Sequence, residues 1–475
     1  MKFLITLLSV FPIACAALAA DPVPNWPQFR GAGALGIADA EKPPVEIGPM
    51  KNVKWKVAVP PGLSCPVIWG DKLFLTAFEN DKLFTIAYSR TDGKELWRQE
   101  APAAKIEVYM KTEGSPAAST VATDGQRVIA YFGSCGLLCY DFDGKLQWKY
   151  ELPCAETNYD FGSGTSPILV DGMVILGRDL MKGSKLIVVD AKTGSLLWEK
   201  SREGFPTSYS SPAIWDQPTG KEIVFPGFLK LTAYDLKTGA QKWTVSGMPA
   251  VTCTTPVVVD GELIFAGWSP SGATDFKMPT FDELLKQGDE DGDGVLTEKE
   301  SEKTFLKGFF KNNDTNHDGK LTREEWDAGI KAMAAGKNCA VAIKPGGTGD
   351  ISATHVRWKV TKGMPYVPTP LVYRGQMYTI SNRGQLSAYD VKTGKEVFTE
   401  ENIGLTGAYA SPVAANGYVY LFGLDGTAVV LKAGDFADVK HRVKFPERIA
   451  ATPAIVDNTL YVRGAKTLYA FSEKL

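Results

Sequence analysis

Short apolar segments separated by turn residues recur along the whole chain. Residues 166–177 (SPILVDGMVILG) hold two such segments around Asp-Gly, and residues 184–200 (SKLIVVDAKTGSLLWEK) hold two more around Asp-x-x-Thr-Gly. Asp-Gly favours a tight hairpin, while in the longer turn Asp caps the backbone and Gly takes a positive φ. The pattern predicts a unit of four short antiparallel strands in about 40–50 residues, the size of a propeller blade.

Two sequence markers show that this unit repeats. A small residue followed by proline occurs once per unit, and successive prolines are 50, 51, 45, 44, 114, 42 and 41 residues apart. The dipeptides are Cys65-Pro66, Ser115-Pro116, Ser166-Pro167, Ser211-Pro212, Thr255-Pro256, Thr369-Pro370, Ser411-Pro412 and Thr452-Pro453. A tryptophan follows the proline by 31 or 32 residues at Trp97, Trp148, Trp198 and Trp243. We interpret these tryptophans as core residues wedged between neighbouring blades.

The markers delimit seven complete units and three C-terminal strands of an eighth. The missing strand is at the other end of the chain, around Trp55. Pairing the two ends would close a ring and remove its open edges. The prediction is an all-β fold, an eight-bladed β-propeller of four-stranded blades, built from residues 51–270 and 338–475 after an N-terminal extension over 21–50.

The repeat resembles the PQQ-like (quinoprotein) β-propeller family. Residues 25–31, NWPQFRG, are similar to the segment that begins many secreted bacterial members. The resemblance covers nearly all of the chain outside the long step between prolines. It implies an eight-bladed propeller and does not by itself imply an enzyme.

The long step of 114 residues contains a segment with a helical pattern. Residues 271–337 hold helix-like stretches around two acidic loops, 289–300 and 314–325. Both loops fit D-x-[DN]-x-[DN]-G-x5-E at every position and so resemble EF-hand calcium loops. The prediction is a small all-α EF-hand pair inserted in the fifth blade.

The coordination chemistry of calcium explains the spacing within each loop. Positions 1, 3 and 5 offer side-chain oxygens, position 7 a backbone carbonyl and position 12 a bidentate glutamate, with glycine at position 6 for the turn. The predicted ligands are Asp289, Asp291, Asp293, Val295 and Glu300 in the first loop and Asp314, Asn316, Asp318, Lys320 and Glu325 in the second. We expect Leu296 and Leu321 to pair the loops, and the spacing suggests one shared helix between Glu300 and Asp314. Exported modules of this kind bind calcium with a Kd of about 10⁻⁴–10⁻³ M.

The insert is predicted to lie on the same face as the loops that join one blade to the next. It follows the second strand of its blade and precedes the third, so it leaves the sheet at that end. In the propellers that this chain resembles, ligands usually bind on this face, and the candidate ligand residues are Tyr159, Asp160, Tyr209, Tyr366, Tyr409 and Arg448. Two hypotheses follow: a calcium-ordered flap beside an aromatic funnel, or an appendage that only stabilises the fold.

The activity has three alternatives at this stage. The resemblance implies PQQ-dependent dehydrogenases that oxidise an alcohol or sugar, which hold PQQ on a tryptophan platform with a propeller calcium, a catalytic aspartate and often adjacent cysteines. The sequence has no adjacent cysteines, and we find no convincing match to that cofactor set. The resemblance also includes the outer-membrane assembly lipoprotein, a scaffold without catalysis. We favour a calcium-binding module, more a binding or scaffold protein than an enzyme, whose partner is an unknown protein or small molecule.

Charge and histidine content limit the remaining classes. The net charge is −2, which argues against a nucleic-acid partner, and three histidines are too few for a His-rich zinc or haem site.

The N-terminus predicts export. Residues 1–20 resemble a signal peptide, so we expect an exported, periplasmic or extracellular protein without a membrane span. Pro12-Ile13-Ala14 before Cys15 is a poor lipobox, so lipid anchoring is not expected. The six other cysteines permit disulfides or buried thiols, and we expect a monomer.

Overall fold

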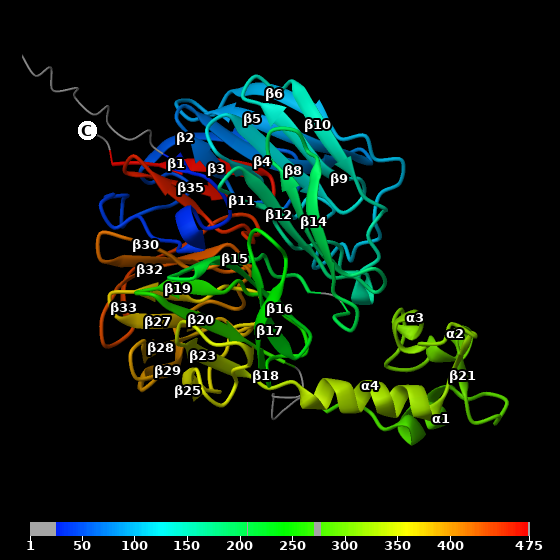
Figure 1. Cartoon of the computed structure of the whole chain (residues 1–475). Coiled ribbons are helices and arrows are strands. Elements are labelled where there is room, and N and C mark those ends of the chain that lie inside the picture. The colour runs from blue at the N-terminus through cyan, green and yellow to red at the C-terminus, as the bar shows by residue number, and fades with distance from the viewer. Residues whose placement is uncertain (1–24, 207, 270–276, 474–475) are drawn as a thin grey trace, which may run out of the picture.

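Each predicted four-strand unit forms one antiparallel sheet, and eight such sheets surround a central axis (Figure 1). The computed structural model describes residues 25–206, 208–269 and 277–473, so the predicted signal peptide and Cys15 lie outside the described residues. The strands of the first four blades are β3 (Val67–Trp69), β4 (Lys72–Glu79), β5 (Lys82–Ser89) and β6 (Glu95–Glu100); β7 (Ala122–Thr123), β8 (Arg127–Phe132), β9 (Gly136–Asp141) and β10 (Leu146–Glu151); β11 (Ile168–Val170), β12 (Met173–Arg178), β13 (Lys185–Asp190) and β14 (Leu196–Ser201); β15 (Ala213–Gln217), β16 (Gly220–Gly227), β17 (Lys230–Asp235) and β18 (Gln241–Ser246). This arrangement confirms the predicted propeller.

The second half of the ring contains the interrupted blade and the closing blade. Its strands are β19 (Val257–Val259), β20 (Glu262–Gly267), β23 (Cys339–Ile343) and β25 (Val356–Val360); β26 (Leu371–Tyr373), β27 (Gln376–Ile380), β28 (Gln385–Asp390) and β29 (Glu396–Asn402); β30 (Val413–Ala415), β31 (Tyr418–Phe422), β32 (Thr427–Lys432) and β33 (Asp438–Lys444); β34 (Ala454–Val456), β35 (Thr459–Arg463), β36 (Thr467–Phe471) and β2 (Val53–Ala58). A short strand, β24 (Gly349–Asp350), pairs in parallel with β18 and covers the outer edge of the fourth blade.

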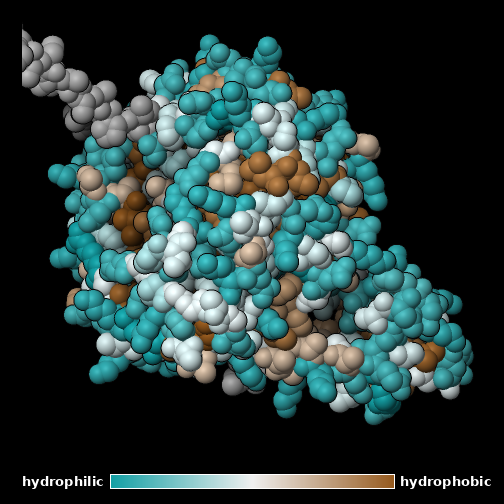
Figure 2. All heavy atoms as spheres, viewed as in Figure 1, coloured by the Kyte–Doolittle hydropathy of each residue, from teal (hydrophilic) through white to brown (hydrophobic). Residues whose placement is uncertain are grey.

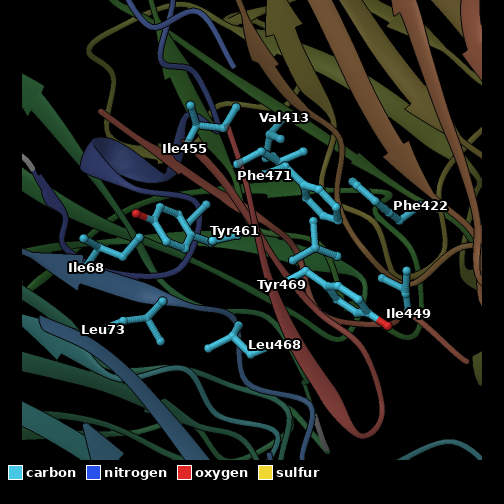
Figure 3. Packing of buried hydrophobic residues seen from close by; sticks show 14 of the residues in the cluster. Ile68, Leu73, Val413, Phe422, Ile449, Ile455, Tyr461, Leu468, Tyr469 and Phe471 are labelled. Atoms are coloured by element: carbon cyan, nitrogen blue, oxygen red, sulfur yellow. The ribbon is translucent and has the colours of Figure 1, made fainter. Parts of the chain in front are cut away.

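The ring is closed by the two ends of the chain, as predicted. Strand β2 pairs antiparallel with β36, with Trp55 opposite Ala470. Figure 3 shows the apolar cluster at this closure, in which Leu73 of the first blade, Phe422 of the seventh and Leu468 of the eighth are all buried. Because the core continues across the junction, the closing blade packs like the others.

The periodic tryptophans dock each blade onto the next. Their indole N–H groups donate to backbone carbonyls of the neighbouring blade at 2.9–3.1 Å, in the pairs Trp55–Arg90, Trp97–Phe142, Trp148–Ala191, Trp198–Leu236 and Trp358–Val391. Each indole ring also packs against the glycine in the turn between the third and fourth strands of the neighbouring blade. Trp243 differs, because its N–H donates to Glu222 of its own blade at 2.8 Å.

A ring of hydrogen bonds around the axis links all eight blades. Seven backbone N–H groups donate to the hydroxyl or thiol of the next blade at 2.9–3.2 Å. The ring residues are Cys65, Thr120, Ser166, Ser211, Thr255, Thr369, Ser411 and Thr452. The predicted marker Ser115-Pro116 is wrong, because Thr120 occupies the ring in the second blade and β7 begins only at Ala122. A longer loop before this blade places a Ser-Pro dipeptide upstream of the true position.

The N-terminal segment enters the central channel of the propeller from the face opposite the inter-blade loops. Strand β1 (Asn25–Trp26) adds a fifth strand to the first blade beside β3, and a short 3-10 helix, η1 (Ala32–Ala34), follows. Between them, the buried guanidinium of Arg30 donates to five backbone carbonyls, including those of Thr369 and Pro412 in two different blades. These bonds fix the segment inside the channel.

The insert is a separate helical unit between β20 and β23 (Figure 1). Its elements are α1 (Phe281–Gly288), β21 (Leu296–Thr297), α2 (Glu298–Ser301), α3 (Phe310–Asn313), β22 (Lys320–Leu321) and α4 (Arg323–Ala335). Leu296 pairs with Leu321, as predicted, and both are buried in the insert's own apolar cluster. The predicted shared helix is wrong: α2 and α3 are separate, and Gly308 between them has a φ of 76°.

Two further features concern membrane-spanning helices and cysteines. Within the described ranges, no helix is long and apolar enough to cross a bilayer. The six cysteines of these ranges are free thiols, and Cys65, Cys139 and Cys339 are buried.

We predict that a turn glycine under an indole ring stabilises the fold in two ways: it adopts a positive φ, and it leaves room for the ring. In Gly194→Ala the new Cβ would lie 2.6 Å from the Trp148 ring, whereas in Gly172→Ala it would meet nothing within 4 Å, and both glycines have a φ above 70°. We expect Gly172→Ala to cost about 1–2 kcal/mol and Gly194→Ala about 1–3 kcal/mol more. Urea denaturation measures both, and equal costs would contradict the role of the indole.

Candidate functional site

A funnel of about 590 Å³ lies on the axis, on the face that carries the inter-blade loops. Seven of the eight ring residues line it, and so do all eight residues that lie two positions before a ring residue. These are Leu63, Ala118, Gly164, Tyr209, Cys253, Val367, Tyr409 and Ala450. Phe29 also lines the funnel, and Arg30 beside it is bound to the channel wall, so the N-terminal segment forms a floor. The funnel is therefore closed below and open toward the insert.

The wall of the funnel is asymmetric. Three tyrosines, Tyr209, Tyr366 and Tyr409, line it, whereas the second and third blades contribute only the small residues Ala118 and Gly164 at the position two before the ring residue. The long loop before the second blade adds Met110 and Glu113, and the next loop adds Phe161. Among the described residues that line the funnel, Glu113 is the one carboxylate, and none is lysine, arginine or histidine.

The predicted ligand-face residues do not all line the funnel. Tyr209, Tyr366 and Tyr409 line the funnel, whereas Tyr159 lines a smaller neighbouring cavity. Asp160 is exposed on the rim. Arg448 lies outside the funnel wall, where its guanidinium is 5.5 Å from the Tyr409 ring centroid and donates to the carbonyl of Thr112 at 2.6 Å.

The polar groups of the tyrosines are held by neighbours. The Tyr409 hydroxyl donates to Oε2 of Glu113, and the Tyr209 hydroxyl donates to the carbonyl of Asn158 at 2.8 Å. Burial raises the pKa values of Tyr209 and Tyr366 well above the usual value, and it raises the pKa of the Cys253 thiol to about 12. At neutral pH these three side chains are therefore uncharged. Glu113 is the acidic side chain among the described lining residues.

The insert contacts the rim of the funnel directly. Asn312 donates from Nδ2 to Oδ1 of Asn158 at 3.0 Å, and the Phe309 ring meets the Tyr159 ring edge-on at 5.3 Å. Phe309 also lines the funnel, and a second, apolar cavity of about 210 Å³ lies between insert and propeller. Figure 2 shows apolar atoms where the two parts meet. Tyr159 and Asp160 have φ values of 57° and 53°, a conformation that costs such residues energy.

The first acidic loop brings its oxygens together. Carboxylate oxygens of Asp289, Asp291 and Asp293 lie within 4.8 Å of one another, although exposed acidic groups can do so without a metal. Backbone N–H groups of the loop donate to all three carboxylates. Hydrogen bonds from Thr297 lower the pKa of Glu300, which favours its ionised form.

In the second loop, backbone N–H groups likewise donate to the side-chain oxygens of Asp314, Asn316 and Asp318. Asp314 is 4% exposed; its Oδ2 accepts from Gly319, but its buried Oδ1 has no hydrogen-bond partner in the described part of the chain. A buried carboxylate oxygen without a partner is costly, and a cation would satisfy it. The donor sets of both loops therefore fit calcium.

The fold and the funnel agree with the comparison with known families. The family model for the outer membrane protein assembly factor BamB matches residues 55–277 and 298–474. The chain belongs to this family of PQQ-like β-propellers. No curated protein matches the sequence.

Several solved structures share the fold at low identity. BamB from Moraxella catarrhalis is 14% identical, with 88% of this chain and 96% of that chain covered and a TM-score of 0.54. A europium-containing methanol dehydrogenase is 10% identical, with 95% and 98% covered and a TM-score of 0.62. The quinohemoprotein alcohol dehydrogenase from Comamonas testosteroni is 12% identical, with 95% and 81% covered and a TM-score of 0.57. Structures with this fold thus include BamB and two dehydrogenases, so the fold alone does not decide the function.

The described funnel residues do not fit PQQ. PQQ is a planar quinone with three carboxylates, so a site for it needs cations. The funnel lining offers one carboxylate and no cationic side chain, because Arg448, which lies over the Tyr409 ring, is not among the lining residues. A trianion would meet Glu113 without a counter-charge, at a high cost in a partly buried cavity.

Several residues of the site were not predicted from the sequence, among them Phe29, Glu113, Cys253 and Phe309. Cys253 could have been found, because it lies two positions before the ring residue Thr255, as Tyr209 and Tyr409 do before theirs. Glu113 and Phe309 carry no such signal, because they lie in irregular loops outside the repeat.

A second carboxyl is buried behind the funnel wall. Glu107 is 2% exposed, and its Oε2 accepts from the backbone (3.1 Å) and the hydroxyl (2.7 Å) of Ser163, which lines the funnel. Its buried Oε1 has no hydrogen-bond partner among the described residues. Burial raises the pKa of Glu107 to about 7, and the bonds from Ser163 and the charge of Arg178 oppose the shift.

We predict that Glu107 makes the stability fall as pH rises. The folded state holds the proton more tightly than the unfolded state, so stability is lost between the ordinary carboxyl pKa and about 7. Between pH 5 and pH 8 the expected loss is about 2–3 kcal/mol relative to Glu107→Gln. Urea denaturation at both pH values tests this, with Glu203→Gln, an exposed carboxyl, as control. A Glu107→Gln profile parallel to that of the native chain would contradict it.

Proposed function

We propose that this chain is an exported, calcium-binding PQQ-like propeller that binds a ligand in its funnel, as a binding protein and not a quinone enzyme. One observation carries the proposal: a helical insert with two calcium-type loops is seated on the rim of a closed, aromatic funnel. Export rests on residues 1–20, which lie outside the described residues.

Calcium and the funnel are linked by one segment of the insert. Glu300 ends the first loop and Asp314 begins the second, so predicted metal ligands flank residues 302–313 on both sides. This segment contains Phe309, which lines the funnel, and Asn312, which bonds the rim. Calcium at the two loops would fix both ends of the segment that contacts the rim. The alternative is an insert that binds calcium and only stabilises the fold.

Two other functions have weaker support. The match to the BamB family model favours a protein partner, and an assembly scaffold is the second candidate, in which the funnel or the blade edges would bind a protein. A PQQ dehydrogenase is supported by the fold of its relatives but not by the charge of the funnel.

We predict two calcium ions per chain, with a Kd of about 10⁻⁴–10⁻³ M. Glu300→Gln is expected to remove binding at the first loop and Glu325→Gln at the second, because the amide carries no negative charge and offers one oxygen in place of the bidentate carboxylate at position 12. Isothermal titration calorimetry measures the stoichiometry. The matched controls Glu298→Gln and Glu324→Gln change exposed carboxyls of the same loops and should retain both ions. No calcium uptake at millimolar concentration would contradict the proposal.

We further predict that calcium protects the rim. Amides of residues 157–162 and 302–313 are expected to exchange more slowly with calcium than without it, because ordering the segment strengthens the contacts of Asn312 and Phe309. Hydrogen-exchange mass spectrometry checks this, and the Glu300→Gln/Glu325→Gln variant should show no change. Protection confined to the insert would favour the stabilising appendage.

A further inference from the structure

We propose that the funnel takes an organic cation, an ammonium or guanidinium group flanked by apolar carbon. This inference rests on the proposed function, in which the funnel is the ligand site, and it specifies the chemistry of that ligand. The observations are the charge of the lining, the arrangement of aromatic rings and the closed floor.

The charge of the funnel favours a cation. Oε2 of Glu113 accepts from the Tyr409 hydroxyl, whereas Oε1 accepts no hydrogen bond from the described residues. The other ionisable groups of the lining are tyrosines and cysteines, which are neutral at pH 7. A cation would therefore meet a carboxylate with an open oxygen and no competing positive charge on the funnel wall.

The aromatic lining offers ring surface to such a ligand. The hydroxyls of Tyr209 and Tyr409 are already bonded to Asn158 and Glu113, so these side chains present mainly their rings. Phe161 meets Tyr209 edge-on at 5.9 Å, and Trp268 meets Tyr366 at 5.1 Å. Aromatic rings attract cations through their negative faces, and the contact of Arg448 with the Tyr409 ring is an example within this site.

Other ligand classes fit less well. An anion would face Glu113, because Arg448 is not among the residues that line the funnel and its guanidinium is already engaged by the Thr112 carbonyl and the Tyr409 ring. A neutral apolar molecule would shield the open oxygen of Glu113 from solvent and offer it no partner in return. Burying an unpaired charge in this way is costly. A cation both pairs the carboxylate and uses the rings.

The test compares choline with 3,3-dimethylbutan-1-ol, which has the same shape without the charge. We expect choline to bind the calcium-loaded full chain at least about 10-fold more tightly. Glu113→Gln, which can still accept from Tyr409, should remove most of that preference and leave the neutral alcohol unaffected. Tyr366→Leu should weaken choline selectively, because it keeps an apolar side chain but removes the ring. Glu156→Gln, an exposed carboxyl on a neighbouring inter-blade loop, is the control.

Each outcome is decisive for the ligand class. Equal binding of the two probes, or binding of neither, would overturn the cation inference. Choline binding that survives Glu113→Gln would also overturn it, because the charge would then be recognised elsewhere. Thermal unfolding of the variants shows whether they fold. These results are independent of calcium stoichiometry and rim protection, so the inference can fail while the proposed function stands.

Discussion

The hydrogen bond from a backbone N–H of one blade to the hydroxyl of the next is the interaction on which the structure depends. Six of the eight ring residues accept from one neighbour and donate to the other, whereas within this ring Ser211 only accepts and Thr255 only donates. On this crowded axis only small side chains with an oxygen or sulfur can accept such a bond. Ser, Thr and, at Cys65, a thiol fill all eight positions. The ring fixes where each inter-blade loop ends, and the residue two positions earlier lines the funnel in all eight blades. The repeat thereby provides eight equivalent positions on the funnel wall, and the side chain at this position differs between blades.

The N-terminal segment changes this ring from a channel into a funnel. Within the described part of the chain, Arg30 has no carboxylate partner and is held by five carbonyls, which together offer the negative ends of oriented dipoles. Since those carbonyls belong to two blades as well as to the segment itself, the floor also ties the blades together. The funnel then faces the side on which the insert contacts the rim.

The periodic residues could be predicted from sequence, and the irregular ones could not. Four strands per unit, closure by Trp55 and the Leu296–Leu321 pair follow from local turn and loop chemistry, which acts within a few residues. Ser115-Pro116 was misplaced because a dipeptide is a weaker constraint than the ring bond that selects Thr120. The shared helix failed at Gly308, where a positive φ breaks the backbone. Glu113 and Phe309 gain their positions from long-range packing, which no local pattern records.

The rim shows why the insert and the funnel should be considered together. Tyr159 and Asp160 hold left-handed backbone conformations, each costing about 1–2 kcal/mol, and such strain persists only where surrounding contacts maintain it. Those contacts include Asn312 on Asn158 and Phe309 on Tyr159, both from the segment between the two acidic loops. The insert carries a net charge of −6 over residues 275–331, with 15 acidic and 9 basic side chains, and the remainder of the chain +4. Without cations the acidic loops repel themselves, so their order and the rim contact should weaken together; on the proposed function, calcium outside the funnel sets the shape of its mouth.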